Sequence, residues 1–356
     1  MHIRLILIAF ICGCFLPAAR AQFSVFTESE RNDASEPEFI PVEDYWLLHF
    51  DAAVFAQKTE NIPFAQDVKP ANSPVEIDFP LPDGTVETFR VVRYRMYEPE
   101  LAAAFPDLQT FIGVCVKNPL RRVRFDLTAL GLRALIHHEN GRVYYDPPAL
   151  DRPDVVVCYR AEDLPQSMEE RHCELTTPPA EAPPVDYTTK AGDCQMRVYR
   201  TAVAVTGEYA NYYQATSSAD AGLVLSAVTT SFNRANDVLE NDLGIRLILK
   251  ANTDALFYYD PNTDPYTNND VFAMLSENQT NVDNVIGSAN YDIGHVLATS
   301  QGGVASLGVV CNNSAKARGV TGLLVPQGDP FDIDCSTHEI GPQLGANHTF
   351  NNDCAG

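Results

Sequence analysis

Apolar and polar residues alternate along the first half of the chain with the two-residue period of a β-strand. The segments with this period include 75–79, 88–92 and 123–127. Asp-Gly and Asn-Gly favour tight hairpin turns, so we expect one hairpin around Asp83-Gly84 and a second around Asn140-Gly141. One short helix is predicted, at 98–105. This pattern is typical of an antiparallel β domain with little helix.

The period becomes helical in the second half. Six apolar residues recur at helical spacing over about five turns; they are Val224, Val228, Phe232, Ala235, Val238 and Leu239. Gly244 ends this pattern, and the apolar segment 245–249 follows it as a buried strand would. Further strands are predicted at 197–206, 291–297 and 302–310. Helix and strand alternation predicts a mixed twisted sheet with packed helices, so the whole chain is assigned to the α+β class.

The two halves are separated by a segment rich in proline, threonine and acidic residues, at 176–190. It has no apolar period, so we expect an extended linker that proteases reach easily. The expected division is therefore one domain at 22–175, the linker, and a second domain at 191–356. Forty-five per cent of the 356 residues are apolar, which is enough for two cores of ordinary size.

The first 21 residues have the organisation of a secretory signal peptide. A short positive region with Arg4 precedes an apolar core at 5–16, and residues 19–21 (Ala-Arg-Ala) match an A-x-A cleavage site. We therefore expect secretion and a mature chain that begins at Gln22. No later segment has the ~18 apolar residues that a membrane-spanning helix needs, so no membrane insertion is predicted.

Charge and cysteine content limit the partners and the cross-links that this protein can have. The formal net charge of −22 argues against nucleic acid and anionic membranes as partners. Seven cysteines lie outside the signal segment; they are Cys115, Cys158, Cys173, Cys194, Cys311, Cys335 and Cys354. An oxidising compartment makes them candidates for disulfides, and the odd number leaves one without a partner. Their pairing and the oligomeric state stay open.

The strongest chemical signal is a histidine pattern near residue 340. His338-Glu339, Gly345 and His348 have the spacing of H-E-x-x-H-x-x-G-x-x-H, the zinc site of the metzincin peptidases. Residues four apart share a helix face, so His338 and position 342 would face one Zn²⁺. We expect Glu339 to be the general base on metal-bound water. A positive φ at Gly345 would turn the chain so that His348 becomes a further ligand.

Pro342 occupies the position where this pattern requires a second histidine. The change removes an imidazole, and a proline ring inside a helix clashes with the carbonyl of residue i−4, here His338, at a cost of roughly 3 kcal/mol. We therefore expect a weakened zinc site. Asp334, Cys335 and His295 are the candidate substitute ligands, although the favoured interpretation of His295 is a hydrogen-bonded core histidine.

Other metal candidates are weaker. The loop 260–270 and the pair Asp332 and Asp334 carry oxygen atoms suited to Ca²⁺, but neither has EF-hand spacing, and a solvated turn is favoured for both. His137 and His138 lie beside the second hairpin turn. They are interpreted as surface strand residues rather than as metal ligands.

The order of these parts resembles the secreted bacterial reprolysin-like (adamalysin-type) metzincins. The resemblance rests on the long helix, the strands, Cys311 and the zinc helix, and on the runs 278–280, 284–295, 316–322 and 328–334. It covers 190–356 closely and 75–160 as a pro-domain. It implies a zinc endopeptidase made as an inactive precursor, with His338 and His348 as metal ligands and Glu339 as the base.

The resemblance also assigns roles outside the zinc motif. One segment maps onto the edge strand to which a peptide substrate adds; it consists of Gly303, Val304, Ala305, Ser306 and Leu307. Cys173 is a candidate latency thiol for the fourth zinc position, and a plain disulfide is the favoured alternative. Members of the family continue well beyond the zinc motif, so we expect a catalytic domain cut short after Gly356.

Three functions remain as hypotheses. The leading one is a secreted zinc endopeptidase precursor that acts on proteins or peptides and is impaired by Pro342 and the early end. The alternative is a non-catalytic secreted protein that keeps a peptide-binding groove. In the third, the pro-domain serves a relative as an inhibitor or folding aid. Zinc content separates the first from the others, and peptide binding without zinc favours the second.

Overall fold

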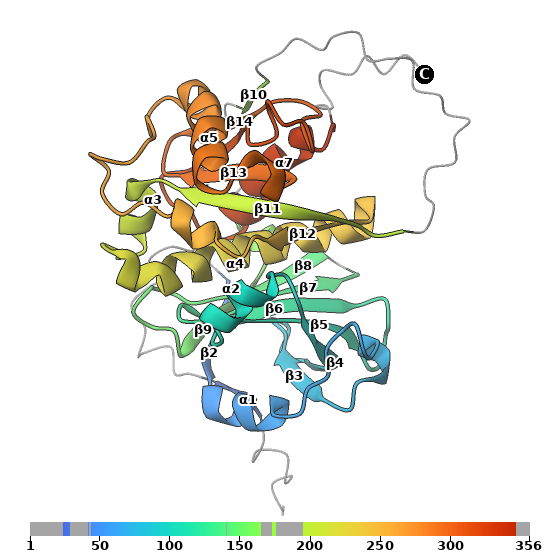
Figure 1. Cartoon of the computed structure of the whole chain (residues 1–356). Helices are drawn as coiled ribbons and strands as arrows, with labels where there is room; N and C mark the ends of the chain where they lie inside the picture. Colours follow the sequence, from blue (N-terminus) through green and yellow to red (C-terminus); the bar gives the residue numbers. More distant parts are fainter. Residues whose placement is uncertain are drawn as a thin grey trace, which may run out of the picture.

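The computed structural model describes residues 24–28, 42, 44–139, 141–164, 173–175 and 195–346, with 173–175 as backbone alone. Two β-sheets, of nine and six strands, dominate it (Figure 1). Within these ranges no helix is both long and apolar enough to cross a bilayer.

The nine-stranded sheet pairs its strands antiparallel in the order β1-β2-β9-β8-β7-β6-β5-β4-β3. Its strands are β1 (Phe26–Glu28), β2 (Trp46–Phe50), β3 (Glu76–Pro80), β4 (Val86–Tyr94), β5 (Gln109–Cys115), β6 (Arg122–Thr128), β7 (Gly131–His138), β8 (Gly141–Asp146) and β9 (Val155–Arg160). The first predicted hairpin is confirmed by the pairing of β3 with β4, between which Gly84 has φ of +83°. The second is confirmed by the pairing of β7 with β8.

An aromatic core on one face explains the alternating pattern of this sheet. Phe111 on β5 stacks on Phe125 on β6, with ring centroids 4.7 Å apart. Helix α1 (Ala52–Thr59) covers them and places Phe55 edge-on to Phe111 at 5.4 Å. Such edge and stacked contacts are the preferred geometries of aromatic pairs. Asp51 caps α1 by accepting hydrogen bonds from two backbone amides of its first turn.

The six-stranded sheet is mixed, with the order β10-β14-β15-β13-β11-β12. Its strands are β10 (Cys173–Leu175), β11 (Arg197–Val205), β12 (Ile245–Leu249), β13 (Ile293–Ala298), β14 (Gly302–Ala305) and β15 (Gly319–Gly322). Helices α4 (Ala221–Val238) and α5 (Val271–Val285) cover opposite faces of it, since Val203 packs with α4 residues and Ala204 with α5 residues. The predicted α+β class, with an antiparallel sheet followed by a mixed sheet and packed helices, is confirmed.

Shorter elements connect these strands and helices, apart from a helical run at 329–343 that belongs to the candidate site. They are α2 (Pro99–Ala104), α3 (Gly207–Tyr212), the 3₁₀ turns η2 (Pro70–Asn72), η3 (Ala161–Asp163), η4 (Ser218–Asp220), η6 (Thr253–Leu256) and η7 (Ser288–Asn290), and the π-helical turn η5 (Leu239–Leu243). The predicted strand at 302–310 is too long. The extended backbone ends at Ala305, and Gly308 and Cys311 then take φ of +63° and +62°, which bends the chain away from the sheet.

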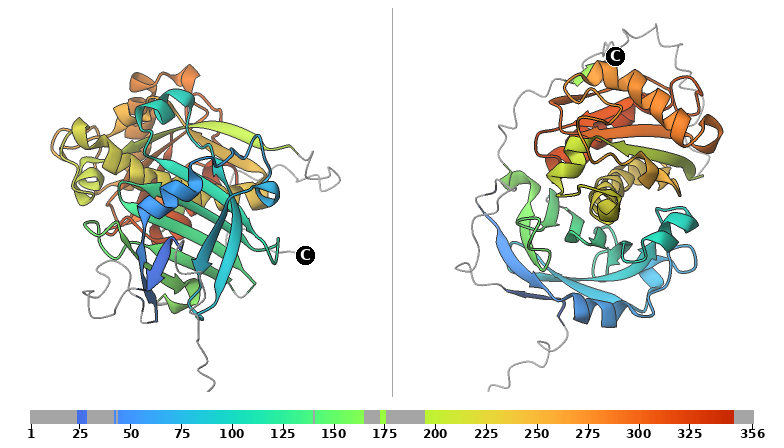
Figure 2. Two further views of the ribbon diagram at one scale, coloured as in Figure 1. Left: turned by 90° about the horizontal axis from the view of Figure 1, so that it is seen from below. Right: turned by 60° about the vertical axis from the view of Figure 1, so that its left-hand side comes forward.

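Helix α4 lies between the two sheets and is buried on both sides (Figure 2). Fifteen of its eighteen residues are buried, so it is an internal helix rather than a surface one. Its apolar stripe faces the second sheet. Its other face carries Arg234, which is paired with Asp146 of β8 at 2.7 Å. The layers therefore follow the order α1, first sheet, α4, second sheet and α5.

The N-terminal half also covers both edges of the second sheet. At one edge, Leu249 of β12 donates a backbone hydrogen bond to Met96 at 2.8 Å and accepts one from Glu98 at 2.9 Å. At the other edge, β10 pairs in parallel with β14, and Cys173 lies opposite Gly303. Open edge strands template unwanted pairing with other chains. The N-terminal half therefore protects the second sheet at both ends.

Candidate metal centre and peptide-binding edge

The predicted zinc helix is part of one helical run. The short α6 (Asp329–Phe331) leads into the π-helical turn η8 (Asp332–Thr337), and α7 (His338–Gln343) follows directly. Gly345 has φ of +102°, a conformation that side chains with a Cβ rarely adopt. The predicted helix and its glycine turn are both found.

Pro342 lies buried within α7, and the helix continues through it. As a proline it has no N–H to offer the carbonyl of His338, four residues earlier. Its own carbonyl accepts hydrogen bonds from the backbone amides of Gly308 and Gly345, both at 2.8 Å. The last turn of α7 is therefore tied to the loop that leaves β14.

The two candidate chemical groups at the start of α7 have different surroundings. His338 is exposed, whereas the Glu339 side chain is 2% exposed. Glu339 packs against the backbone of β14 so closely that a Cβ at Gly303 would lie 2.5 Å from its Cγ and 2.7 Å from its Oε1. The absence of a side chain at Gly303 is what makes room for Glu339.

The residues described fit a metal site only in part. His338 offers an imidazole beside the Glu339 carboxylate, position 342 offers none, and His348 lies outside the described residues. Among the residues that the structure does describe, no cluster of three or more His, Cys, Asp or Glu side chains can hold a metal ion. A complete zinc site would therefore need His348.

His295 is not a substitute ligand, and its interpretation as a core histidine is confirmed. It is fully buried, its Nδ1–H donates to Gln343 Oε1 at 2.7 Å, and its Nε2 accepts from the Thr321 hydroxyl at 2.8 Å. Burial lowers the pKa of this imidazole to about 4. Gln343 also donates to the Gly294 carbonyl at 2.8 Å. His295 thus positions α7 against β13 through Gln343.

This burial predicts an acid-sensitive fold. Because the pKa of His295 falls from 6.5 to about 4 on folding, its neutral form stabilises the protein fully above pH 6.5. That contribution, about 3 kcal/mol, is lost as pH falls towards 4. Urea unfolding measures how much more stable the wild type is than a His295→Gln variant. This difference in the free energy of unfolding should be about 3 kcal/mol smaller at pH 4 than at pH 7. A difference that does not change with pH would contradict the neutral core imidazole.

The remaining substitute and calcium candidates have other surroundings. Cys335 is buried, and its thiol points to the Gly322 carbonyl at 3.8 Å. Asp332 is not in a solvated turn as predicted; it lies in helical η8 and is paired with Arg234 at 2.9 Å. In the 260–270 loop, Asp264 accepts a hydrogen bond from the Gly207 amide at 2.6 Å. For this loop, the prediction of a solvated turn rather than a calcium site stays untested.

The predicted peptide-binding segment lies directly beside Glu339. β14 contains Gly303, Val304 and Ala305, and Ser306 and Leu307 follow it. One side of β14 pairs antiparallel with β15. Its other side pairs with β10, so the three described residues of β10 occupy the edge to which a peptide would add. The role of this segment in substrate binding stays a prediction.

A second prediction concerns the close packing of Gly303. Gly303→Ala should lower the free energy of unfolding by about 1–3 kcal/mol and displace Glu339, because the new methyl group would overlap its side chain. Gly222→Ala is the control, since the nearest atom to a Cβ there is 4.0 Å away and alanine favours the helix. Chemical denaturation of both variants measures the effect. Equal midpoints for the two would show that the Gly303 contact is not tight.

His137 is a strand residue of β7 as predicted, but its side chain is only 29% exposed. Its Nε2 bonds to the Asp237 carboxylate of α4, so it lies at the contact between the first sheet and α4. Sequence reasoning missed this whole contact, which includes Arg234, Asp146 and Asp332. The sequence feature that could have revealed this contact is the presence of charged residues on the face of the long helix opposite its apolar stripe.

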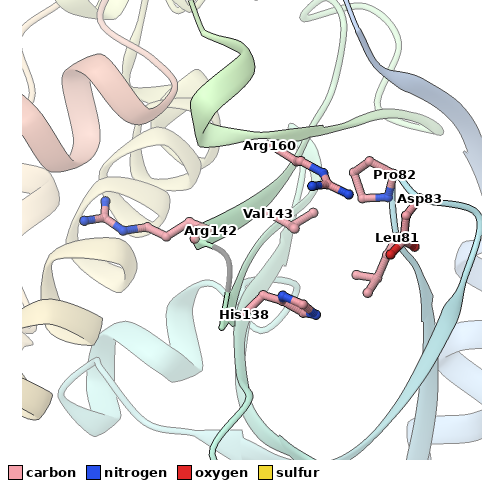
Figure 3. Close-up of a pocket in the computed structure, with 8 residues that line it drawn as sticks. Leu81, Pro82, Asp83, His138, Arg142, Val143 and Arg160 are labelled. Carbon is pink, nitrogen blue, oxygen red and sulfur yellow. The ribbon is translucent and has the colours of Figure 1, made fainter.

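His138 lies at a small cavity of about 30 Å³ with Arg142 and Arg160 (Figure 3). This volume holds a single water molecule. Burial and the nearby Arg121 lower the pKa of His138. Asp83 also lines the cavity and the Arg142 side chain points away from it, so the interpretation that His138 is not a metal ligand stays a prediction (Figure 3).

The cysteines that the structure describes do not form the disulfides that the sequence suggested. No disulfide forms within the described residues, and Cys115, Cys158 and Cys311 are free thiols. Cys194 and Cys354 lie outside the described residues, as does the predicted linker at 176–190. Only the backbone of Cys173 is described, so its role as a latency thiol stays a prediction.

Comparison with known proteins finds a matching family model and matching solved structures. Residues 195–356 match the model of the reprolysin-like metallopeptidases of metallo-peptidase family M12B. Metalloproteinase-II from Bacteroides fragilis has a crystal structure that aligns with a TM-score of 0.45 and 13% identity, covering 83% of this chain and 85% of that one. A search of curated proteins gives no match.

Proposed function

We propose that this chain, whose residues 195–356 belong to the reprolysin-like metallopeptidase family, is the precursor of a secreted zinc-dependent endopeptidase with a weakened metal site. One observation carries the proposal. Glu339 is buried at the start of α7 against Gly303, so a carboxylate adjoins the strand on which a peptide would align. The signal-like segment at 1–21 supports export.

Each residue has a chemical task in this proposal. His338 and His348 would hold Zn²⁺, which supplies a bound water of lowered pKa when present. Glu339 would act as the general base, taking a proton from the attacking water and passing it to the nitrogen of the leaving amine. β14 aligns the substrate backbone by strand addition. Gly303 leaves room for Glu339 beside that backbone.

The position of β10 supports a precursor form. A substrate cannot pair with β14 while Cys173–Leu175 occupy its outer edge. These residues immediately precede the predicted linker, where cleavage would separate them from the second sheet. We therefore propose that 22–175 is a pro-domain that keeps the peptide edge covered.

Zinc analysis of the dialysed full chain tests the weakened site. With an imidazole missing at position 342, we expect well under one zinc per chain. Losing even a group that only hydrogen-bonds to a metal ligand costs about 10–100-fold in metal affinity, and the loss of a ligand should cost at least as much. Tightly bound stoichiometric zinc would contradict the proposal and point to a replacement ligand such as Asp334.

A non-catalytic peptide-binding protein is the alternative function. Two features favour it: β14 could pair with a peptide once β10 is removed, and position 342 carries no imidazole. Peptide binding by the cleaved protein that is unchanged by a chelator would support this alternative over the peptidase.

A further inference from the structure

A second cavity lies in the N-terminal half, away from the zinc helix. Its volume is about 340 Å³, within the range of small-molecule sites. β4, β5 and the α2 region line it, and its principal residues are Phe64, Arg93, Arg95, Tyr97, Pro99 and Leu108. α2 and the segments on either side of it supply much of the apolar wall, through Tyr97, Pro99, Ala102, Pro106 and Leu108.

Phe64 fixes two arginine side chains at this cavity. The Arg95 guanidinium carbon lies 4.2 Å from the Phe64 ring centroid, and that of Arg93 lies 5.7 Å from it. Arg93 lies on β4 and Arg95 follows the last residue of that strand, and both guanidinium groups contact the same ring. Cation–π contacts of this kind hold a guanidinium in place while leaving hydrogen-bond donors for another group.

These two arginines lack the carboxylate partners that other arginines of the chain have. Arg124 is paired with Glu240 at 3.2 Å, and Arg234 with two aspartates. Within the described residues, the Arg93 guanidinium donates only to the Gln109 amide oxygen at 3.1 Å, and its Nε is buried without a hydrogen-bond partner. Arg95 makes no ion pair there.

This lack is notable because the chain has 47 acidic side chains and only 25 basic ones. Arg93 is half-buried and Arg95 is exposed, so the cost of a partly desolvated charge without a counter-charge falls on Arg93. Burial also lowers the pKa of the Arg93 guanidinium. An anion in the cavity would complete the pairing that the protein itself omits.

We propose that this cavity binds a small organic anion, namely one carboxylate on an apolar or aromatic body. The carboxylate meets Arg93 and Arg95, since a planar guanidinium donates two parallel hydrogen bonds to it. The apolar body packs on Tyr97, Pro99 and Leu108. A free aromatic acid and the last residue of a peptide share this chemistry.

Calorimetric titration of the full chain at low ionic strength tests the site, with N-acetylphenylalanine as the probe. A ligand of about fifteen non-hydrogen atoms at ordinary efficiency should bind with a Kd on the order of 1 mM. N-acetylphenylalaninamide, which lacks the charge, should bind at least ~10-fold more weakly. A peptide ending in phenylalanine distinguishes the sources: affinity equal to the probe indicates a peptide terminus, and weaker binding indicates a free acid.

Two substitutions on the same segment make a matched pair. Arg95→Gln should weaken binding at least ~10-fold, and the exposure of Arg95 means that the fold tolerates the change. Arg90→Gln removes the same charge from β4, but Arg90 pairs with Glu76 at 3.1 Å outside the cavity, so binding should be unchanged. The proposal is overturned by no binding of the probe, by equal affinity for the amide or for inorganic phosphate, or by equal losses in the two variants.

Discussion

Arg234→Ala is expected to lower the free energy of unfolding by about 3–5 kcal/mol. Arg234 lies on α4 between the sheets and donates to Asp146 at 2.7 Å and to Asp332 at 2.9 Å. All three side chains are 3% exposed. Removing one partner of a buried ion pair leaves an uncompensated charge; here Asp332 would lose its ion-pair partner and Asp146 would keep only Arg133, at 4.0 Å. Urea unfolding at pH 7 measures the loss.

Arg200→Ala provides the control for this prediction. Arg200 makes a comparable two-point pair with Asp292, at 2.8 and 3.1 Å, but its side chain is 42% exposed. Pairs in contact with solvent contribute at most about 1 kcal/mol. If both variants lost a similar free energy of unfolding, the ion pairs around α4 would be in contact with solvent and contribute little to stability.

The pH dependence sharpens the test. Burial raises the pKa of Asp332 to about 6 even with Arg234 present. A carboxyl group whose pKa is raised on folding stabilises most below its unfolded pKa of 3.8, and this contribution is lost as pH rises through the folded value. Without Arg234 the group should take up a proton more readily. The loss in Arg234→Ala should therefore shrink between pH 7 and pH 5.

This ion-pair cluster also shows why sequence reasoning was incomplete. The apolar period of α4 predicted the helix and the face that meets the second sheet. Its other face is buried through charge pairs with Asp146 and Asp332, which are 88 and 98 residues away along the chain. No local pattern brings such partners together, so charged residues on a helix look the same whether they meet solvent or a second sheet.

Helix α5 was missed for a related reason. Its buried face includes the amides Asn278 and Gln279 as well as Met274, which interrupts the apolar period. Asn278 donates to the Ala317 carbonyl at 2.6 Å and accepts from the Tyr266 hydroxyl at 2.9 Å. The helix around His338 and the turn at Gly345 depend on neighbours in sequence, so a local motif was sufficient to predict them.

Pro342→His is expected to raise zinc affinity by about 10–100-fold or more. That range is the effect of groups that only hydrogen-bond to a metal ligand, and a restored ligand should contribute at least as much. Position 342 lies one helical turn from His338 on the same face of α7, so both imidazoles would face one metal ion. The substitution also restores a backbone N–H for the His338 carbonyl. Competition with a fluorescent zinc chelator measures the affinity of both proteins.

Two further variants separate the ligand from the helix. Pro342→Ala restores the N–H without an imidazole, so it should stabilise α7, by up to about 3 kcal/mol, and leave zinc affinity unchanged. Glu339→Gln added to Pro342→His should retain the zinc but hydrolyse no peptide, because the base is lost. If Pro342→Ala gains as much zinc affinity as Pro342→His, then helix geometry and not the missing imidazole limits the site. If Pro342→His gains none, the side chain at 342 does not face the metal. In that case, the buried carbonyl contacts of Pro342 with Gly308 and Gly345 would be the reason for a proline at this position.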